Sequence, residues 1–556
     1  MKRLIAILLA AALILTACGK GGGNSGDAGT AVTGDGTVTG TADNGGAAGQ
    51  TTDNGADNID TADDGGNASP AVPARELTYS KQTREVSYEA QPFSITVEAE
   101  DGVLEGKLTT GNSRKGYNGS GYVTNFNQAP GNKLAVTVEI PYAQFYDITV
   151  RAAADQYKIN YLTVNGDSVC EIVCDGDKSK EFVDLTAYSV YLDAGPAEFG
   201  VQESWGWFDL DSITVETGNI ISPDTYNGVS SKLANPNAND DAAKLMEYLV
   251  SIYGNYTLAG QYCAHNSSTE VEGIYKATGK YPAVRGFDMI FCSPNSGYSN
   301  MSEISQAKSW AAKGGIVSFS WHWHGPVGKN SFYTSDSDFR IPDARTAENL
   351  SLVSAADLKT KYQNGELTEK QYKLISDIDV ISFHLKSLRD AGIPILWRPL
   401  HEASGGWFWW GATGADDYIW LWKLMFNRMT YVHGLDNLIW VWNAQDKSWY
   451  PGDEYVDIVG EDIYAEAYDY SSQSAKFRSV LDYPDTPKLT TLSENGVIMD
   501  PELCCRDNVW WLWFNVWNGD FLFEGMDTNE KYTSDEMLNK TYNSEYVITL
   551  DELPWN

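Results

Sequence analysis

The stretch Ile393-Pro394-Ile395-Leu396-Trp397-Arg398-Pro399-Leu400-His401-Glu402 combines an apolar run of strand length with a carboxylate at its end. Seven more apolar runs of similar length lie in the same half of the chain, and strong helical stretches separate several of them. They cover residues 257–263, 281–289, 315–323, 437–443, 457–464, 488–494 and 509–517. Strands that alternate with helices eight times are typical of a (β/α)8 barrel, which we predict for residues 240–556.

Chemically reactive side chains gather where these runs end. Glu402 closes the fourth run, and Glu494 closes the seventh within Ser493-Glu494-Asn495-Gly496. Because a barrel of this kind keeps its active site at the C-terminal ends of its strands, the two glutamates can face each other across the mouth. Hydrolysis of a glycosidic bond needs two carboxylates: one protonates the leaving oxygen, and the other attacks the anomeric carbon or activates water. The indoles of residues 406–411 offer flat faces on which a sugar ring can stack.

Residues 87–218 carry a different pattern. Runs such as Leu134–Glu139 and Ser212–Glu216 alternate apolar and polar residues, and turns rich in Gly and Asn separate them. This period of two predicts an antiparallel β-sandwich. A polar connector at 219–239 leads to the barrel. The predicted fold is therefore multidomain, an all-β sandwich followed by an α/β (β/α)8 barrel.

The N-terminus has the features of a secretory signal. Met1-Lys2-Arg3 precedes an apolar run that is too short to span a bilayer, and Leu15-Thr16-Ala17-Cys18 resembles the bacterial lipobox. We expect a lipoprotein signal peptide over 1–18, a lipid on Cys18, and a location on the extracellular face of the bacterial cell envelope. An ordinary signal peptide that contains a cysteine is the alternative. Residues 19–86, rich in Gly, Ala, Thr, Asn and Asp, predict a disordered low-complexity linker.

The charge and the cysteine content of the chain exclude several classes of binding partner. The chain has 40 basic and 75 acidic residues and a net charge of −35, which argues against nucleic acid and against an anionic membrane surface. A neutral polymer is unaffected by that charge. The six cysteines after Cys18 do not form a disulfide scaffold, although Cys263 and Cys292 could pair, and no Cys/His cluster has zinc spacing. We expect a monomer with no cofactor for catalysis.

The barrel half resembles the β-mannanases of glycoside hydrolase family 26. Four motifs carry the resemblance: residues 320–323, residues 397–402 with 406–411, residues 460–464, and residues 492–496. The resemblance implies a retaining, double-displacement mechanism with Glu402 as acid/base and Glu494 as nucleophile. It also implies sugar contacts at His322, His401, Trp407, Tyr464 and Trp517. Arg398 and Asn443, which lie at strand ends, complete the predicted substrate-binding set.

The inherited roles lead to expectations about charge. Glu402 must hold a proton, so apolar walls and the charge of Glu494 should raise its pKa, while donors such as Tyr464 or Arg398 should keep Glu494 ionised. The two carboxyl groups should lie about 5 to 5.5 Å apart. One position departs from the family: Asn518 follows Trp517, where some relatives have Arg, which leaves contacts to a more distant mannose open. The insertion at 325–371 either shapes specificity or is only a surface excursion.

The sandwich half resembles carbohydrate-binding modules of family 35. The similarity rests on residues 97–100, 116–123 and 205–211. It implies a structural Ca²⁺, for which we expect Glu98, Glu100 and Asp211 as ligands, since hard cations prefer oxygen. The alternative is that these three acids bind no ion and are simply solvated positions on the strands. The candidate sugar platforms are Tyr122, Trp205 and Trp207. In a regular strand Trp205 and Trp207 share one face, and the alternative is that this face packs in the core of the sandwich.

The leading hypothesis is a retaining endo-β-1,4-mannanase that hydrolyses mannan, galactomannan or glucomannan at the cell surface. In one alternative, the same barrel acts on β-glucan or xylan. In the other, the chain is a non-catalytic surface glycan-binding lipoprotein. Measurement of the reducing ends released from mannan, β-glucan and xylan would distinguish these hypotheses.

Overall fold

A computed structural model describes residues 88–126, 132–176, 178–205, 207–297 and 302–555. The predicted signal peptide, Cys18 and the linker over 19–86 lie outside the described residues. Among the helices that are described, none combines the length and the apolar character that a membrane crossing requires.

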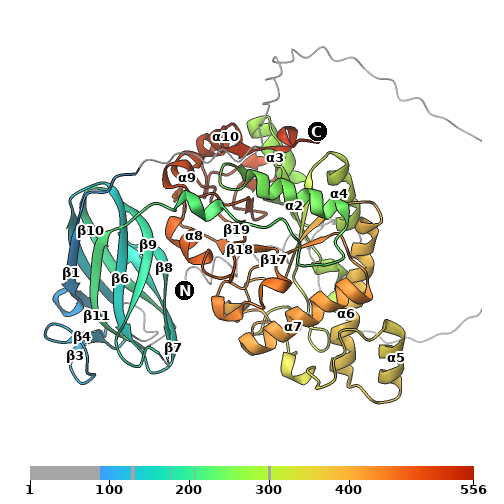
Figure 1. The fold of residues 1–556 in the computed structure, drawn as a ribbon, viewed down its shortest axis with the longest axis horizontal. Helices are drawn as coiled ribbons and strands as arrows, with labels where there is room; N and C mark the ends of the chain where they lie inside the picture. The colour runs from blue at the N-terminus through green and yellow to red at the C-terminus, as the bar shows by residue number, and fades with distance from the viewer. Residues whose placement is uncertain (1–87, 127–131, 177, 206, 298–301, 556) are drawn as a thin grey trace, which may run out of the picture. The chain divides into compact units, whose positions relative to one another are not determined.

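The N-terminal part of the described chain is a sandwich of two antiparallel sheets (Figure 1). One sheet has the order β3-β4-β11-β6-β9, with β1 also paired to β11, and the other has the order β2-β5-β10-β7-β8. The strands are β1 (Ser94–Glu98), β2 (Val103–Glu105), β3 (Thr109–Gly111), β4 (Tyr122–Thr124), β5 (Lys133–Ile140), β6 (Gln144–Ala153), β7 (Tyr157–Val164), β8 (Asp167–Asp175), β9 (Val183–Leu192), β10 (Gly195–Trp205) and β11 (Asp209–Thr217).

The alternating pattern explains the core of the sandwich. Along β5, Val136, Val138 and Ile140 are buried, whereas Thr137 and Glu139 between them are exposed. The inward side chains of both sheets join one apolar cluster, as the period of two predicts. The predicted all-β sandwich is confirmed.

The C-terminal half is a closed barrel of eight parallel strands, β13 to β20 in chain order. Each strand lies within or overlaps one of the eight predicted apolar runs, so the predicted (β/α)8 barrel is confirmed. The strands are β13 (Gly260–Tyr262), β14 (Val284–Asp288), β15 (Ile316–Trp321), β16 (Ile395–Pro399), β17 (Leu438–Trp442), β18 (Ile458–Ile463), β19 (Leu489–Asn495) and β20 (Phe514–Val516). Short pairs outside the barrel are β12 (Thr257–Leu258) with β23 (Val547–Ile548) and β21 (Phe523–Glu524) with β22 (Asp527–Thr528).

Helices follow the strands and cover the barrel (Figure 1). They are α2 (Asp240–Ile252), α3 (Thr269–Thr278), α4 (Ser302–Ala312), α5 (Ala355–Gln363), α6 (Glu369–Arg389), α7 (Ala415–Asn427), α8 (Ser474–Val480), α9 (Pro501–Asp507) and α10 (Asp535–Tyr542). The longest, α6, begins with a capping box between Thr368 and Gln371. It then buries Leu374, Ile378 and Ile381 at helical spacing, so one apolar stripe faces the barrel.

The connector over 219–239 is attached to the barrel. The buried Tyr226 donates its hydroxyl hydrogen to the carbonyl of Asn508 over 2.5 Å, and the Asn508 amide in turn donates to the carbonyl of Ile221 over 2.7 Å. Helix α8 also contacts the sandwich, because Ser474 donates to the carbonyl of Ser189 in β9. The polar composition of this segment therefore does not make it a free linker.

Candidate active site

The backbone that presents Glu402 is held in an uncommon conformation. Strand β16 ends at Pro399, and both Leu400 and Glu402 then take positive φ angles of 55° and 52°. A side chain with a Cβ disfavours this region by about 1 to 3 kcal/mol, and it persists only where neighbours enforce it. Here the amide of Glu402 donates to the carbonyl of Asn443, at the end of the adjacent strand β17, over 2.7 Å. The neighbouring strand thus fixes the turn that carries the carboxylate.

The Trp407 indole holds the side chain of Glu402. Its Nε1 donates to Glu402 Oε2 over 3.0 Å. The Trp407 loop is fixed by the insertion at 325–371, because Thr334 donates its amide to the Trp407 carbonyl and its hydroxyl to the Gly406 carbonyl. Tyr333 also forms an isolated bridge with Phe408. The insertion is therefore not only a surface excursion, because Tyr333 and Thr334 contact the loop that carries Trp407.

A β-bulge places Glu494. Strands β18 and β19 pair Glu461 with Leu492 and then Asp462 with Glu494, so Ser493 is an extra residue in β19. Gly460 makes room for this bulge, since a Cβ at that position would lie 1.9 Å from Ser493 Oγ. The bulge brings the Glu494 carboxylate to the barrel mouth.

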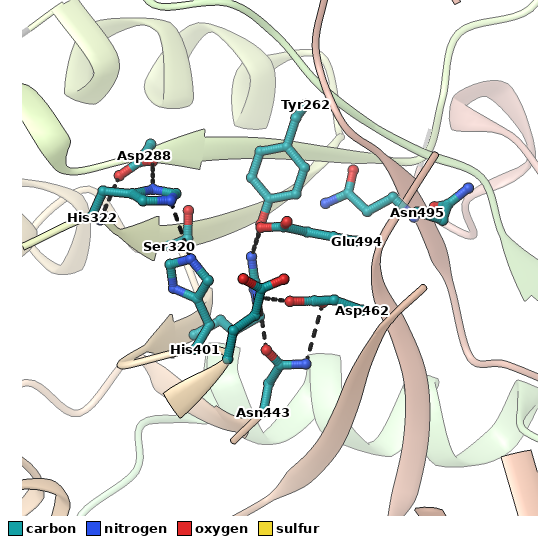
Figure 2. A network of polar contacts seen from close by, with 12 residues as sticks. Tyr262, Asp288, Ser320, His322, His401, Asn443, Asp462, Glu494 and Asn495 are labelled. Carbon is teal, nitrogen blue, oxygen red and sulfur yellow. Dashed lines mark hydrogen bonds and ion pairs between the residues drawn. The ribbon is translucent and has the colours of Figure 1, made fainter. Parts of the chain in front are cut away.

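The Arg398 guanidinium contacts the acids Asp462 and Glu494 of the mouth, which Figure 2 shows beside Tyr262 and Asn443. Nη1 donates to Asp462 Oδ2 over 2.9 Å and to Asn443 Oδ1 over 3.0 Å. Nη2 donates to Glu494 Oε1 and lies 3.3 Å from the Tyr262 hydroxyl. Arg398 and Asn443 are buried and contact the acids of the mouth, so both position the carboxylates.

The two glutamates have opposite surroundings. Glu494 accepts hydrogen bonds at both oxygens, one from Arg398 and one from the Tyr464 hydroxyl over 2.7 Å, which suits an anion. Burial raises the pKa of Glu402 to about 7, and the charge of Glu494 adds to this shift, while Arg398 and the Trp407 hydrogen bond oppose it. Glu402 therefore holds its proton at pH values below about 7, as expected for a general acid.

The spacing of the carboxylates selects a mechanism. One oxygen each from Glu402, Asp462 and Glu494 lie within 4.8 Å of one another. Retaining glycosidases hold their two carboxyl groups about 5 to 5.5 Å apart, whereas inverting enzymes leave roughly 6.5 to 9.5 Å for a water molecule. The close approach of Glu402 and Glu494 fits retention.

Two histidines and an indole also line the barrel mouth. The Nε2 atoms of His322 and His401 lie 3.3 Å apart, and the ring of Trp517 is centred 5.8 Å from that of His322. The structure thus brings all nine predicted barrel residues to one mouth. They are Glu402, Glu494, His322, Arg398, His401, Trp407, Asn443, Tyr464 and Trp517.

Three further residues at the mouth escaped the sequence prediction. Tyr262 and Asp462 contact Arg398, and Asp288 contacts His322. Each lies at the C-terminal end of a barrel strand, in β13, β18 and β14 respectively. The rule that located Glu402 would have found them if it had been applied to every polar residue at a strand end. The proposed pairing of Cys263 with Cys292 is not formed.

In the sandwich, the predicted calcium ligands lie beside the turn at residues 118–121. Glu100 Oε1 accepts from the amides of Ser120 and Gly121, both at 2.8 Å. The Oε2 atoms of Glu98 and Glu100 are buried without a hydrogen-bond partner in the described part of the chain. Asp211 accepts from the Asn118 amide and from Arg151. Partial burial raises the pKa of Glu98, and the charges of Asp211 and Glu100 add to it. Buried oxygens that lack a partner are chemically suited to a hard cation.

The three predicted sugar platforms differ in exposure. Trp207 is 64% exposed, just before β11. Tyr122 is only 3% exposed, and its hydroxyl bonds to Ser113 and to the Arg114 amide, so its ring faces the interior. Trp205 ends β10, and its side chain lies outside the described atoms. The exposed ring of Trp207 is therefore the one available platform among those whose side chains the structure describes.

Known proteins share both halves. The sequence profile of Glycosyl hydrolase family 26 matches residues 234–552, and that of Carbohydrate binding module (family 35) matches residues 95–218. A mannan endo-1,4-beta-mannosidase of Thermothelomyces thermophilus is 36% identical over 506 residues, which cover 88% of this chain and 95% of that protein. Mannan endo-1,4-beta-mannosidase B of Piromyces sp is 36% identical over 83% of this chain and 77% of its own length.

Two solved structures have the same arrangement of elements. A Podospora anserina GH26-CBM35 β-(1,4)-mannanase is 36% identical, with a TM-score of 0.53, and the match covers 83% of this chain and 98% of that one. A ruminal GH26 endo-β-1,4-mannanase is 27% identical, with a TM-score of 0.58, over 84% of this chain and 99% of that one.

Proposed function

Because the chain belongs to glycosyl hydrolase family 26, we infer from the geometry of its barrel site that it is a retaining mannan endo-1,4-β-mannosidase. The observation that carries this conclusion is the contrast between the two glutamates. Glu402 is buried beside an indole and holds a proton, while Glu494 accepts from Arg398 and Tyr464. An acid and a nucleophile at this separation form the pair that double displacement requires.

The two steps use the same pair in alternating roles. In the first, Glu494 attacks the anomeric carbon while Glu402 gives its proton to the departing glycosidic oxygen, and a covalent glycosyl-enzyme forms. In the second, Glu402, now ionised, takes a proton from water, and the water oxygen displaces Glu494 from the same carbon. The β-configuration is retained, and both glutamates return to their starting protonation states.

The substrate assignment rests on the relatives, which are mannosidases. We expect mannan, galactomannan and glucomannan as substrates. The alternative of a glycan-binding protein without activity has little support, because both carboxylates are present and suitably spaced. Reducing ends should appear from β-mannan and not from β-glucan or xylan. Release from glucan or xylan alone would overturn the mannan assignment, and release from none would favour the binding protein.

For the sandwich, we propose binding of β-mannan at the exposed Trp207 ring and a structural Ca²⁺ beside Glu98 and Glu100. The exposure of Trp207 and the unpartnered Oε2 atoms of both glutamates support this proposal. A bound ion would neutralise the two carboxylates and fix the turn at residues 118–121. Binding is best tested in Glu494→Ala, which cannot hydrolyse the polymer, by affinity electrophoresis on mannan with and without Trp207→Ala. Equal retardation of the two proteins would argue against the platform.

We also propose that a lipid on Cys18 anchors a monomeric enzyme to the extracellular face of the bacterial cell envelope. The lipobox-like sequence at residues 15–18 and the polar stretch that follows support the anchor. In a bacterial host, a radiolabelled fatty acid should label the protein, and Cys18→Ala should abolish the label. Labelled Cys18→Ala protein would overturn the anchor, and a dimer in size-exclusion chromatography would overturn the monomer.

A further inference from the structure

A carboxylate and two histidines, Asp288, His322 and His401, form a chain of contacts that begins at the end of β14 (Figure 2). His401 directly precedes the acid/base residue Glu402 in the sequence. Asp288 Oδ1 accepts from the backbone amides of His322 and Ile290, over 3.0 and 2.9 Å. Asp288 Oδ2 contacts His322 Nδ1. Burial alone would raise the pKa of Asp288, but the charge of His322 and these hydrogen bonds lower it overall. Asp288 is therefore an anion, and the proton on this side of the ring belongs to His322 Nδ1.

The other ring nitrogen of His322, Nε2, faces the Nε2 atom of His401. The two Nε2 atoms, of His322 and His401, lie 3.3 Å apart. Two imidazole nitrogens attract each other only when one carries a hydrogen and the other offers a lone pair. The contact therefore contains one proton, which resides on one ring or the other.

The position of that proton defines two states. If the pair is neutral, His401 donates from Nε2, and His322 presents only a lone pair at the mouth. If the pair carries one additional proton, His322 is an imidazolium that donates from Nε2, and His401 accepts there and holds its own hydrogen on Nδ1. His401 Nδ1 has no hydrogen-bond partner among the described residues.

The surroundings favour His322 over His401 as the ring that takes an additional proton. The charged and titratable groups that face the pair are Asp288 from β14, Glu402 and Arg398 from β16 and its end, Glu494 from β19, and His324. Burial lowers the pKa of His322, but the charge of Asp288 and its hydrogen bond, together with the charge of Glu494, outweigh burial and raise the pKa. Burial, Arg398 and His322 all lower the pKa of His401. The charge therefore resides on His322.

We propose that Asp288 is a positioning residue for the mannanase reaction: acting through His322, it keeps the shared hydrogen on His322 Nε2, so that His401, the residue next to Glu402, accepts it and holds its own hydrogen on Nδ1. The inference rests on the proposed function. Without the Asp288 anion, His322 loses its proton at lower pH and becomes an acceptor at the same atom, and His401 must change its tautomer as well. Substrate recognition then fails at a pH at which the normal enzyme still works.

The test separates the histidine pair from Glu402. In Glu402→Gln, with an activated aryl mannoside that needs no proton and with azide to complete turnover, the alkaline limb of kcat/KM no longer reports Glu402. Adding Asp288→Asn should move the remaining limb to lower pH by about one unit, since a single ion pair shifts a pKa by roughly 1 to 3 units. Asp288→Glu should restore much of the limb. In a His322→Asn background, Asp288→Asn should shift nothing.

A matched pair serves as the control. Asp379 on α6 also contacts a histidine, His433 Nε2, over 2.6 Å, but it does so away from the barrel mouth. Asp379→Asn should leave the limb in place even if stability falls. If Asp288→Asn lowers kcat/KM equally at every pH with the limb unmoved, Asp288 is only structural and the proposal is overturned. If Glu402→Gln turns over no aryl mannoside at any pH, the proposed function fails and this inference fails with it.

Discussion

The barrel mouth and the sandwich turn each gather carboxylates below the surface, but they balance the charge differently. At the mouth, Arg398 lies among Asp462, Glu494 and Glu402 and donates to the first two. At the turn, Glu98 and Glu100 each keep one buried oxygen that accepts no hydrogen bond from the described residues. A buried anion needs a partner. At the barrel mouth the cation is a side chain of the protein, Arg398. The turn of the sandwich is suited to a metal cation taken up from solution.

This difference in charge balance matches the separate tasks of the two regions, hydrolysis at the barrel mouth and polymer binding by the sandwich. A fixed guanidinium lets one carboxylate stay charged while its neighbour stays protonated, which is the division of labour that hydrolysis needs. An exchangeable ion gives rigidity that depends on solution conditions. Changes at the mouth should therefore affect turnover on every substrate, and changes at the turn should affect stability and polymer binding.

The largest effect should come from the nucleophile. Glu494→Ala removes the group that forms the glycosyl-enzyme, and turnover should fall on the order of 10⁶-fold, as when a nucleophile is removed from a protease. Azide should partly restore the activity with inversion, because it enters from the face that Glu494 vacates. The product anomer can be followed by NMR. Near-normal hydrolysis without azide would disprove the assignment.

The acid should show a smaller and substrate-dependent loss. Glu402→Ala should slow hydrolysis of mannan by about 10² to 10⁴-fold, the usual contribution of general acid catalysis. On an aryl mannoside with a good leaving group, the first step should be nearly unaffected, because that group departs without a proton. Steady-state kcat/KM on the two substrates measures the difference. An equal loss on both would show that Glu402 has a structural role.

The charge division predicts the direction of the pH dependence. The pKa of Glu402 is raised from 4.5 to about 7, so the protonated acid is present below that pH and is lost above it. Activity on mannan should decline as pH rises through about 7. Trp407→Phe removes the hydrogen bond to ionised Glu402, which opposes the raised pKa, and should move this limb to higher pH. A limb that moves to lower pH instead would show that the indole does not stabilise the anion.

The sequence could predict the strands and the acids at their ends, because both follow from local patterns. It could not predict the bulge at Ser493 or the positive φ of Glu402, since each depends on a neighbouring strand. The contact of Asp288 with His322 was missed for the same reason. Local pattern alone locates a functional residue, and tertiary pairing decides how it is oriented.

Burial produced the other departures from prediction. Tyr122 was predicted as a sugar platform, yet its ring is buried and packs beside Phe182 with centroids 5.5 Å apart. The connector has a polar composition, yet Tyr226 fixes it to the barrel at Asn508. A truncation that removes the sandwich should therefore keep this connector, since loss of Tyr226 would expose the barrel surface that it covers.

Removal of a cation should affect the sandwich and spare the mouth. We expect a chelator to lower the unfolding temperature by a few degrees and Ca²⁺ to restore it, since a ligand at 100 times its Kd stabilises by about 2.7 kcal/mol. Glu98→Gln with Glu100→Gln should abolish the response, while Glu139→Gln, an exposed strand acid, should keep it. Calorimetry measures the shift, and hydrolysis of soluble manno-oligosaccharides should stay constant. A chelator that stops this hydrolysis would place the essential cation in the barrel.

The smallest effect should appear at the platform. Trp207→Ala removes an exposed ring that lies far in sequence from both catalytic glutamates, so kcat/KM on soluble manno-oligosaccharides should not change. On insoluble mannan, where capture of the polymer limits the rate, activity should fall about three- to tenfold, the scale of one lost aromatic contact. Tyr142→Ala, at another exposed aromatic of the sandwich, is the matched control and should be neutral on both substrates. If Trp207→Ala were equally neutral on insoluble mannan, polymer capture would belong to the barrel, and the contrast between a catalytic half and a binding half would not hold.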